Sequence, residues 1–230
     1  MKFHSTLARG RLVSRYKRFF ADVLLDDGRE VTAHCPNPGA MLGMNAPGQV
    51  CWLSHDANPK RKLAYTWELV EADGALVICN TLTPNRLVAE ALDAGAISEL
   101  AAYPLRRREV AYGAGSRVDF LLEGAGAPAW VEVKGVTLRR QGGLAEWPDC
   151  VSARGARHAT ELGEMARLGG RAVVLFAVLR SDCDRFAVAA DLDPAFAAAL
   201  AAVRQHGVEV LAYACDVTAD EAVISRAIPL

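Results

Sequence analysis

Three charged residues in the middle of the chain have the types and spacing of a metal-dependent hydrolytic site. Glu132 and Lys134 alternate with valines in the run Val131-Glu132-Val133-Lys134, and Asp119 lies upstream of them. Because side chains alternate along a strand, Glu132 and Lys134 share one face, and Asp119 can join them from the neighbouring strand of a hairpin. Two adjacent carboxylates repel each other unless a cation lies between them, and oxygen ligands favour Mg²⁺ or Mn²⁺. We therefore predict that Asp119 and Glu132 bind the metal and that Lys134 orients a water against a phosphodiester.

Lysine is rare in the C-terminal part of the chain, which makes Lys134 unusual. It is the only lysine after Lys62, although fifteen arginines occur from Arg86 to Arg226. Arginine stays charged at any accessible pH, whereas lysine carries a compact ammonium whose pKa moves on burial. A Glu-x-Lys triplet is nevertheless common, and from the triplet alone the salt-bridged outer face of a hairpin is the better interpretation. The elements around the triplet must decide between these two interpretations.

From Arg11 to Thr81 the chain consists of short β-rich runs separated by turn residues. Asp26-Asp27-Gly28 and Ala72-Asp73-Gly74 are hairpin signals. A closed barrel suits such a region, because closing the sheet removes exposed edges. We therefore predict a small antiparallel barrel over residues 1–82, with strands at 11–16, 19–25, 30–34, 49–54, 63–70 and 75–80.

From Thr83 onward helices alternate with strands. Thr83-Pro84 predicts the N-cap and first turn of a helix that runs to about Ala94. The patterns that follow predict strands at 107–112, 117–122 and 129–138, a helix at 152–168, a strand at 172–179, a helix at 194–206 and a strand at 208–214.

This order of elements favours the catalytic interpretation over the structural ion pair. It places Asp119 on the second strand of the region and Glu132 with Lys134 on the third. Glu90, on the first helix, could supply a further carboxylate from across the sheet. The fold class that we predict is therefore α/β (α+β), with residues 83–230 forming the catalytic domain.

Cations beside aromatic residues in the N-terminal region suit a groove that binds a nucleic-acid strand, because bases stack on aromatic rings and phosphates pair with charge. The alternative is that the cations are solvated and the aromatics fill the barrel, where we predict most of them to lie. Arg154 and His158 share a helix face where they could touch a phosphate, although a lone histidine there is also typical of a half-buried position. The nucleic-acid-binding residues that we predict are Arg15, Lys17, Arg18, Lys60, Arg61, Lys62, Arg154 and His158.

Composition limits the classes of protein to consider. The 230 residues carry a net charge of −1 and are 52% apolar and 23% charged, which is ordinary for a globular protein and unlike a strongly basic nucleic-acid binder. The six cysteines contain no CxxC pair of a zinc or redox site, and we interpret them as small buried residues. The sequence has neither a signal peptide nor a run of about 18 apolar residues, so we expect a cytoplasmic protein with no membrane partner.

Several motifs are distributed over the whole chain. They are Tyr16-Lys17-Arg18-Phe19, His34-Cys35-Pro36-Asn37-Pro38-Gly39-Ala40-Met41, Lys60-Arg61-Lys62 with Thr66-Trp67-Glu68, Asn80-Thr81 with Asn85-Arg86, Ser116-Arg117-Val118-Asp119-Phe120, Glu132-Val133-Lys134, and Pro148-Asp149 with Arg154-Gly155 and His158. Through them the chain resembles the sugar fermentation stimulation protein family of bacteria and archaea, within the PD-(D/E)XK nuclease superfamily. The resemblance implies an N-terminal OB-like barrel joined to a restriction-endonuclease-like αβββαβ domain.

The resemblance also implies a function and roles for residues. It implies a Mg²⁺- or Mn²⁺-dependent nuclease that hydrolyses DNA, with RNA as a further substrate, metal ligation by Asp119 and Glu132, nucleophile positioning by Lys134 and an accessory acidic role for Glu90. The alternative is a non-catalytic DNA-binding regulator of sugar (maltose) utilisation genes. Clustered carboxylates argue against that alternative, because a protein that only binds phosphates gains nothing from them.

Two departures and several open points accompany the resemblance. Val118 stands where the superfamily motif has proline, and the basic segment 139–143 reads as a loop that either clamps substrate or is solvated. The sequence leaves open the strandedness of the substrate, a homodimer as the oligomeric state, the role of the Pro36–Gly39 loop, and whether Asp149 braces a loop or caps a helix.

Overall fold

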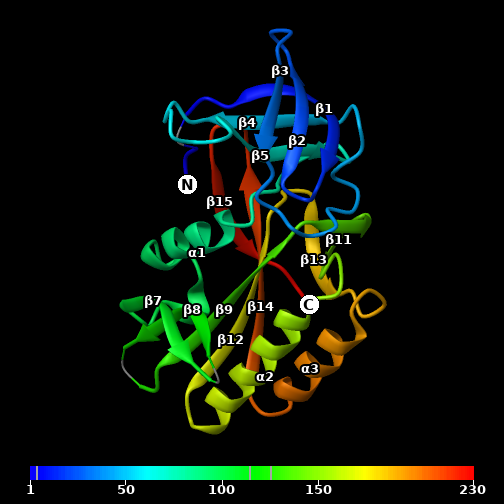
Figure 1. The fold of residues 1–230 in the computed structure, drawn as a ribbon. Coiled ribbons are helices and arrows are strands. Elements are labelled where there is room, and N and C mark those ends of the chain that lie inside the picture. Colours follow the sequence, from blue (N-terminus) through cyan, green and yellow to red (C-terminus); the bar gives the residue numbers. More distant parts are fainter. Residues whose placement is uncertain (4, 114, 125) are drawn as a thin grey trace.

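The N-terminal part of the chain forms the predicted barrel, at the top of Figure 1. The computed structural model describes residues 1–3, 5–113, 115–124 and 126–230. The strands run in the order β3-β2-β1-β4-β5-β6, and a parallel pairing of β3 with β5 closes the barrel. The strands are β1 (Ala8–Tyr16), β2 (Phe20–Leu25), β3 (Glu30–His34), β4 (Val50–His55), β5 (Tyr65–Ala72) and β6 (Ala75–Ile78). The OB-like barrel is thus confirmed, whereas the domain boundary at residue 82 stays a prediction.

Aliphatic residues, methionines, one tryptophan and three of the cysteines fill the barrel, whereas Cys150 is exposed and departs from the expectation that the cysteines are buried. Trp67 is fully buried, but Tyr16 is 39% exposed and Phe19 is 45% exposed. The expectation that most aromatics lie in the core is therefore wrong. The physical reason is their position: Tyr16 and Phe19 flank the turn between β1 and β2, beyond the last inward-facing positions of the two strands. Tyr16 stacks on Phe20, with ring centroids 5.5 Å apart, and so leaves aromatic surface near the turn.

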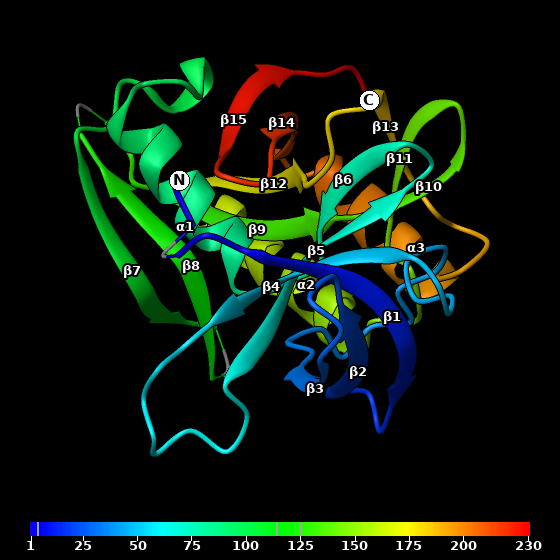
Figure 2. The same ribbon diagram turned by 90° about the horizontal axis from the view of Figure 1, so that it is seen from above.

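The rest of the chain is built on a six-stranded sheet with helices on both faces (Figures 1 and 2). The strand order is β15-β14-β12-β9-β8-β7, and β12 pairs in parallel with both β9 and β14. One apolar core lies between the sheet and α1, and another between the sheet and α2 with α3. The elements are α1 (Thr83–Asp93), β7 (Leu105–Tyr112), β8 (Ser116–Glu123), β9 (Ala129–Val136), α2 (Ala153–Arg167), β12 (Arg171–Val178), α3 (Pro194–Arg204), β14 (Val208–Val217) and β15 (Ala222–Ala227), with a 3₁₀ turn at Ser98–Leu100.

This element order confirms the predicted helix, three strands, helix and strand. The start of α1 differs from the prediction, because Leu82 occupies the cap position without a side-chain hydrogen bond and Thr83 is already helical. The other two helices are capped by side chains: Ser152 accepts from the Gly155 N–H, and Asp193 accepts from the Phe196 N–H. Asp193 also accepts a 2.7 Å hydrogen bond from the Ser152 N–H, so it joins the starts of α2 and α3.

The basic segment after β9 is not a loop. It belongs to β10 (Leu138–Gln141) and β11 (Gly143–Trp147), which form a small sheet with β13 (Cys183–Val188). Arg139 pairs with Asp182 at 3.0 Å, and Arg140 pairs with Asp191 at 2.6 Å. Both arginines therefore have structural carboxylate partners and are not simply solvated, whereas a contact of this segment with substrate stays a prediction.

Several contacts fix the barrel against the larger sheet. The Ile78 N–H donates to the Leu179 carbonyl at 3.0 Å. Buried Arg180 pairs with Asp73 of the barrel at 3.3 Å and with Asp182 at 2.6 Å. Within the described ranges, no helix has the length and hydrophobicity needed to cross a membrane.

Candidate active site

The candidate site lies where β8 separates from β9. The two strands pair from Leu122↔Ala129 to Phe120↔Val131 and no further. At the next position Asp119 extends its side chain, and its Oδ2 accepts the Val133 N–H at 2.7 Å. The carboxylate thus replaces a ladder hydrogen bond that the strand no longer supplies. This local divergence opens one edge of β9 along its charged residues, as the view from above shows for the strands (Figure 2).

Glu132 is the more deeply buried of the two carboxylates. It is 3% exposed, and its Oε1 accepts a 2.7 Å hydrogen bond from Lys134 Nζ and a short one from His158 Nδ1. Its Oε2 is buried and has no hydrogen-bond partner within the described residues. A buried carboxylate oxygen without a donor is unfavourable unless a ligand completes it. Glu132 Oε2 is therefore available to coordinate a cation.

The hydrogen bonds around His158 fix which ring nitrogen carries the proton. Arg154 Nε donates to His158 Nε2 at 3.2 Å, so that nitrogen is the acceptor. The neutral ring then carries its proton on Nδ1 and donates it to Glu132. His158 is only 2% exposed, which corrects the expectation that it contacts nucleic acid. Its neighbour Arg154 is exposed and can still reach a substrate.

The two carboxylates influence each other's ionisation. Burial, and after it the charge of Glu132, raise the pKa of Asp119 to about 6. Burial also disfavours ionised Glu132, but the hydrogen bond from His158 and the charge of Lys134 outweigh it and hold the pKa of Glu132 below its ordinary value. Glu132 is therefore ionised at neutral pH, and Asp119 is destabilised as an anion unless positive charge approaches.

Three residues near the site were not predicted. Asn85 on α1 donates to Asp119 Oδ1 at 2.6 Å. It fixes that carboxylate from the face of the sheet opposite to α2, which carries His158. Tyr112 and Glu161 are buried beside the carboxylates, and the charges of Glu132 and Glu161, after burial, raise the pKa of Tyr112. Asn85 belongs to a motif found in the sequence, whereas nothing local distinguishes Tyr112 or Glu161.

The structure does not bring Glu90 to this site. Its carboxylate pairs with the Met1 amino group at 2.8 Å and lies 4.0 Å from Arg86 Nε. Asn85 occupies the part of α1 that reaches Asp119, so the first helix contributes an amide where we expected an acid.

Comparison with known proteins places the chain in a family. The model described as "Sugar fermentation stimulation protein RE domain" matches residues 82–221, and the one described as "SfsA N-terminal OB domain" matches residues 13–79. The chain belongs to the sugar fermentation stimulation protein family. A family homologue of Rhodospirillum centenum is 56% identical over 231 residues, covering 100% of this chain and 99% of that protein. One of Caulobacter vibrioides is 56% identical over 223 residues, covering 96% and 93%.

A solved structure has the same fold as this family member. It is described as "The structure of Pyrococcus Furiosus SfsA in complex with Ca2+", and it is 26% identical with a TM-score of 0.90, covering 100% of this chain and 97% of that one. The OB barrel and the nuclease-like fold of the sugar fermentation stimulation family are thus present together in one chain.

The predicted cations of the barrel fall into two groups on different flanks. Lys17 and Arg18 are exposed in the turn between β1 and β2, and both have left-handed backbone conformations, with φ of 48° and 64°. Burial raises the pKa of the Cys150 thiol and the charge of Arg18 opposes that shift, so this turn lies near the segment before α2. In the β4–β5 loop, Arg61 pairs with Asp56 at 3.1 Å, and Lys60 and Lys62 are exposed on either side of it.

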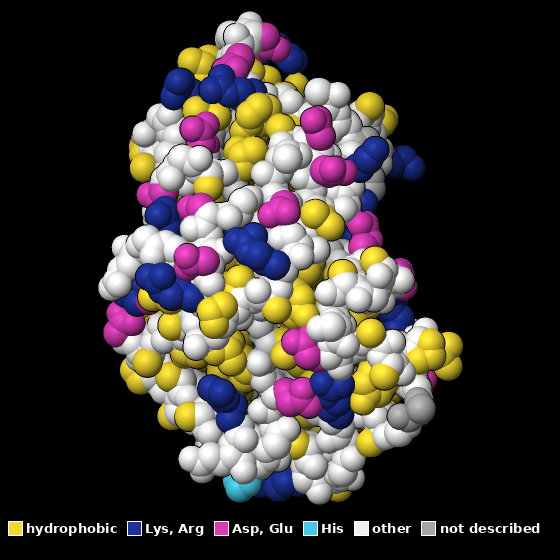
Figure 3. All heavy atoms as spheres, turned by 180° about the vertical axis from the view of Figure 1, so that it is seen from behind, with side chains coloured by type: hydrophobic (Ala, Val, Ile, Leu, Met, Phe, Trp, Pro, Cys, Tyr) yellow, Lys and Arg dark blue, Asp and Glu magenta, His cyan; other side chains and the backbone are white. Residues whose placement is uncertain are grey.

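Arg15 has a different role from the other barrel cations. Its guanidinium donates to the Asn37 and Gly39 carbonyls at 2.7 and 3.0 Å, so it holds the Pro36–Gly39 loop in place. Asp149 braces the same loop by accepting the Met41 N–H at 2.8 Å, and it is not the cap of α2. Viewed from behind, the surface of this family member has cations and carboxylates interspersed, so no broad basic patch covers that face (Figure 3).

The residues of the site fit a divalent cation. Asp119 and Glu132 offer hard oxygen donors, one of which is buried without a partner among the described residues. Among the residues that the structure describes, no three histidine, cysteine, aspartate or glutamate side chains are arranged to hold a metal by themselves. A cation at this point would therefore take its remaining ligands from water or backbone, which suits Mg²⁺ because it keeps several waters.

Proposed function

We propose that this protein is a divalent-metal-dependent nuclease that hydrolyses phosphodiester bonds of nucleic-acid strands. The observation that carries the proposal is the pair of carboxylates at the opening of β8 from β9, with Lys134 beside them and Glu132 Oε2 buried and unpaired among the described residues. A protein that only binds nucleic acid has no use for buried anions facing phosphates. Mg²⁺ or Mn²⁺ is the cation that we propose, and the similar Pyrococcus furiosus structure, described as a complex with Ca²⁺, supports a divalent ion.

Each residue has a distinct task in this proposal. Asp119 and Glu132 hold the cation, which when bound makes water more acidic and neutralises charge on the phosphate. Lys134, within 2.7 Å of Glu132, donates hydrogen bonds to the attacking water or to a phosphate oxygen as negative charge develops. Asn85 and His158 keep the two carboxylates in position from the two faces of the sheet. The exposed cations of the barrel and Arg154 guide the strand.

Removal of metal tests the proposal. We expect the purified protein to cut labelled single-stranded DNA, double-stranded DNA or RNA in Mg²⁺ or Mn²⁺, and to cut none of them in EDTA, because Asp119 and Glu132 alone cannot activate water. Denaturing gels measure the cleavage, and adding excess Mg²⁺ back to the EDTA sample should restore it. Binding of DNA without cleavage in any metal would contradict the nuclease proposal and favour the non-catalytic regulator instead.

The turn between β1 and β2 should contribute to strand binding. We expect the double variant Lys17→Ala/Arg18→Ala to lower the slope of log affinity against log salt by about 1.4, because each phosphate contact on a single strand contributes about 0.7. Fluorescence anisotropy of a labelled single strand over a series of salt concentrations measures the slope.

A matched control removes two cations from the opposite end of the barrel. Arg9 and Arg29 pair with Asp26 and Asp27 at the tip of the β2–β3 hairpin, which points away from the larger sheet in Figure 1. The variant Arg9→Ala/Arg29→Ala should leave the slope unchanged. Equal slopes for the two double variants would show that the β1–β2 turn does not contact phosphate.

A further inference from the structure

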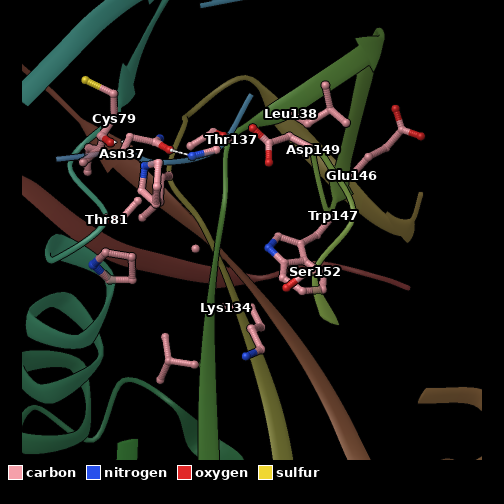
Figure 4. Close-up of a pocket in the computed structure, with 17 residues that line it drawn as sticks. Asn37, Cys79, Thr81, Lys134, Thr137, Leu138, Glu146, Trp147, Asp149 and Ser152 are labelled. Atoms are coloured by element: carbon pink, nitrogen blue, oxygen red, sulfur yellow. Dashed lines mark hydrogen bonds between the residues drawn. The ribbon is translucent and has the colours of Figure 1, made fainter. Parts of the chain in front are cut away.

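A cavity of about 300 Å³ lies between the barrel and the larger sheet (Figure 4). Its size is at the lower end of small-ligand pockets, which span about 300–1,000 Å³. The barrel contributes the Asn37–Gly39 segment, and the nuclease-like part contributes Lys134, Trp147 and Asp149. Of the residues that line the cavity, Lys134 alone belongs to the proposed catalytic groups, and neither Asp119 nor Glu132 is among them, so the catalytic groups account for only one end of the cavity.

The cavity begins at the catalytic lysine. It follows the edge of β9 that β8 leaves open, and its lining includes Val133, Lys134 and Gly135 in sequence. Figure 4 shows Lys134 at one end of the cavity and Asn37, Thr137 and Asp149 at the other. A phosphate held at Lys134 would therefore have the cavity next to it, within reach of the adjoining nucleoside.

One wall is an aromatic ring held rigidly. Trp147 packs edge-on against Phe196, with ring centroids 4.4 Å apart, and lies 5.8 Å from the Phe176 ring. Lys134 Nζ lies over the Trp147 ring, 5.8 Å from its centroid. The apolar side chains of Pro84 and Leu179 add to the lining. An aromatic ring with apolar neighbours in the lining suits a nucleobase, because bases pack well against such rings.

The far end carries fixed polar groups of a defined character. Asn37 is buried, donates to the Cys79 carbonyl at 3.1 Å and accepts the Gly39 N–H at 2.8 Å. Asp149 uses one oxygen for the Met41 N–H, and a carboxylate has further lone pairs to offer. A carboxylate repels a phosphate and accepts hydrogen bonds from amino groups. The ligand of this end is therefore neutral and carries N–H donors.

We propose that the cavity receives a single nucleobase, turned out of the strand beside the phosphate to be cleaved, and that Asp149 favours bases with an exocyclic amino group. This inference rests on the proposed nuclease function and adds the part of the substrate that the site selects. Enzymes that do chemistry on a base turn it out of the stack and recognise its edge in a pocket, so a protein pocket can hold a single base in this way. Cytosine has an amino group that can donate a hydrogen bond to Asp149, whereas thymine has a carbonyl at the same position.

The test compares oligo-dC with oligo-dT of equal length, because both are pyrimidine strands and differ at this edge. Fluorescence anisotropy in Ca²⁺ at about 4 °C measures binding, and a denaturing gel checks that the strands stay intact. We expect oligo-dC to bind about tenfold more tightly, within the range of one specific base contact. Asp149→Asn should abolish the preference, because the asparagine amide can also donate to the thymine carbonyl. The asparagine oxygen can still accept the Met41 N–H, so the loop should keep its place.

The control Asp220→Asn changes an exposed aspartate away from the cavity and should keep the preference. Equal affinities of the two strands for the unchanged protein, or a preference that survives Asp149→Asn, would overturn the inference. Cleavage in Mg²⁺ by the same samples reports separately on the nuclease. Cleavage with equal affinities for the two strands would contradict only the proposed base-binding role of the cavity. A preference for oligo-dC without cleavage would contradict only the proposed nuclease activity.

Discussion

Replacing Lys134 by methionine is expected to slow strand cleavage by about 10²–10³-fold, the usual effect of removing one donor that stabilises developing charge. Methionine keeps much of the volume beside Trp147 but has no ammonium for the water or the phosphate. Single-turnover cleavage in Mn²⁺ measures the loss, and anisotropy should show strand binding changed far less than the rate. Thermal unfolding confirms that the variant is folded.

Two further variants separate charge from chemistry. Lys134→Arg keeps a positive charge, but its larger planar group replaces a compact ammonium in a half-buried position, so we expect it to remain strongly impaired. Lys2→Met removes an exposed lysine and should cleave at the unchanged rate. Full activity of Lys134→Met would mean that the ion pair with Glu132 is only structural.

The parts of the site that sequence could predict are those encoded locally. Glu132 and Lys134 share a face because strand periodicity is two, and the element order puts Asp119 on the adjoining strand. The partners that orient them are not local: His158 meets Glu132 across 26 positions of the chain, and Asn85 meets Asp119 across 34. Such pairs arise because α1 and α2 pack on opposite faces of one sheet. The periodicity of apolar residues predicts single helices and strands, but it does not predict which face of the sheet a helix covers.

The fold shows the same limit in its smaller strands. The long elements with a strong apolar pattern were predicted, whereas β10, β11, β13 and β15 were not. In β10, Arg139 and Arg140 resemble a solvated loop because two of the carboxylates that neutralise them lie far along the chain, at Asp182 and Asp191, while Glu146 faces Arg140 only once β10 and β11 pair. Local polarity therefore does not indicate exposure where tertiary ion pairs stabilise a strand.

The second large effect is expected at His158, which never touches substrate in this proposal. His158→Leu should weaken Mn²⁺ binding by about 10–100-fold, as is usual when a group that orients a metal ligand is removed. Without the hydrogen bond from Nδ1, burial acts on Glu132 with less opposition, so the pKa of Glu132 rises. The difference in affinity between the variant and the unchanged protein should therefore widen as pH falls from about 8 to about 6, towards the ordinary carboxyl range.

Electron paramagnetic resonance of free Mn²⁺ during a titration measures this affinity without depending on catalysis. His158→Asn is the matched variant, because its amide can donate from nearly the place of Nδ1 and should recover most of the affinity. Arg154→Ala should have a smaller effect, since Arg154 contacts only the far nitrogen of the ring. Loss of the His158 hydrogen bond must destabilise the ionised, correctly oriented Glu132 side chain, because that carboxylate is buried. Unchanged Mn²⁺ affinity in His158→Leu would therefore mean that Glu132 does not bind the cation.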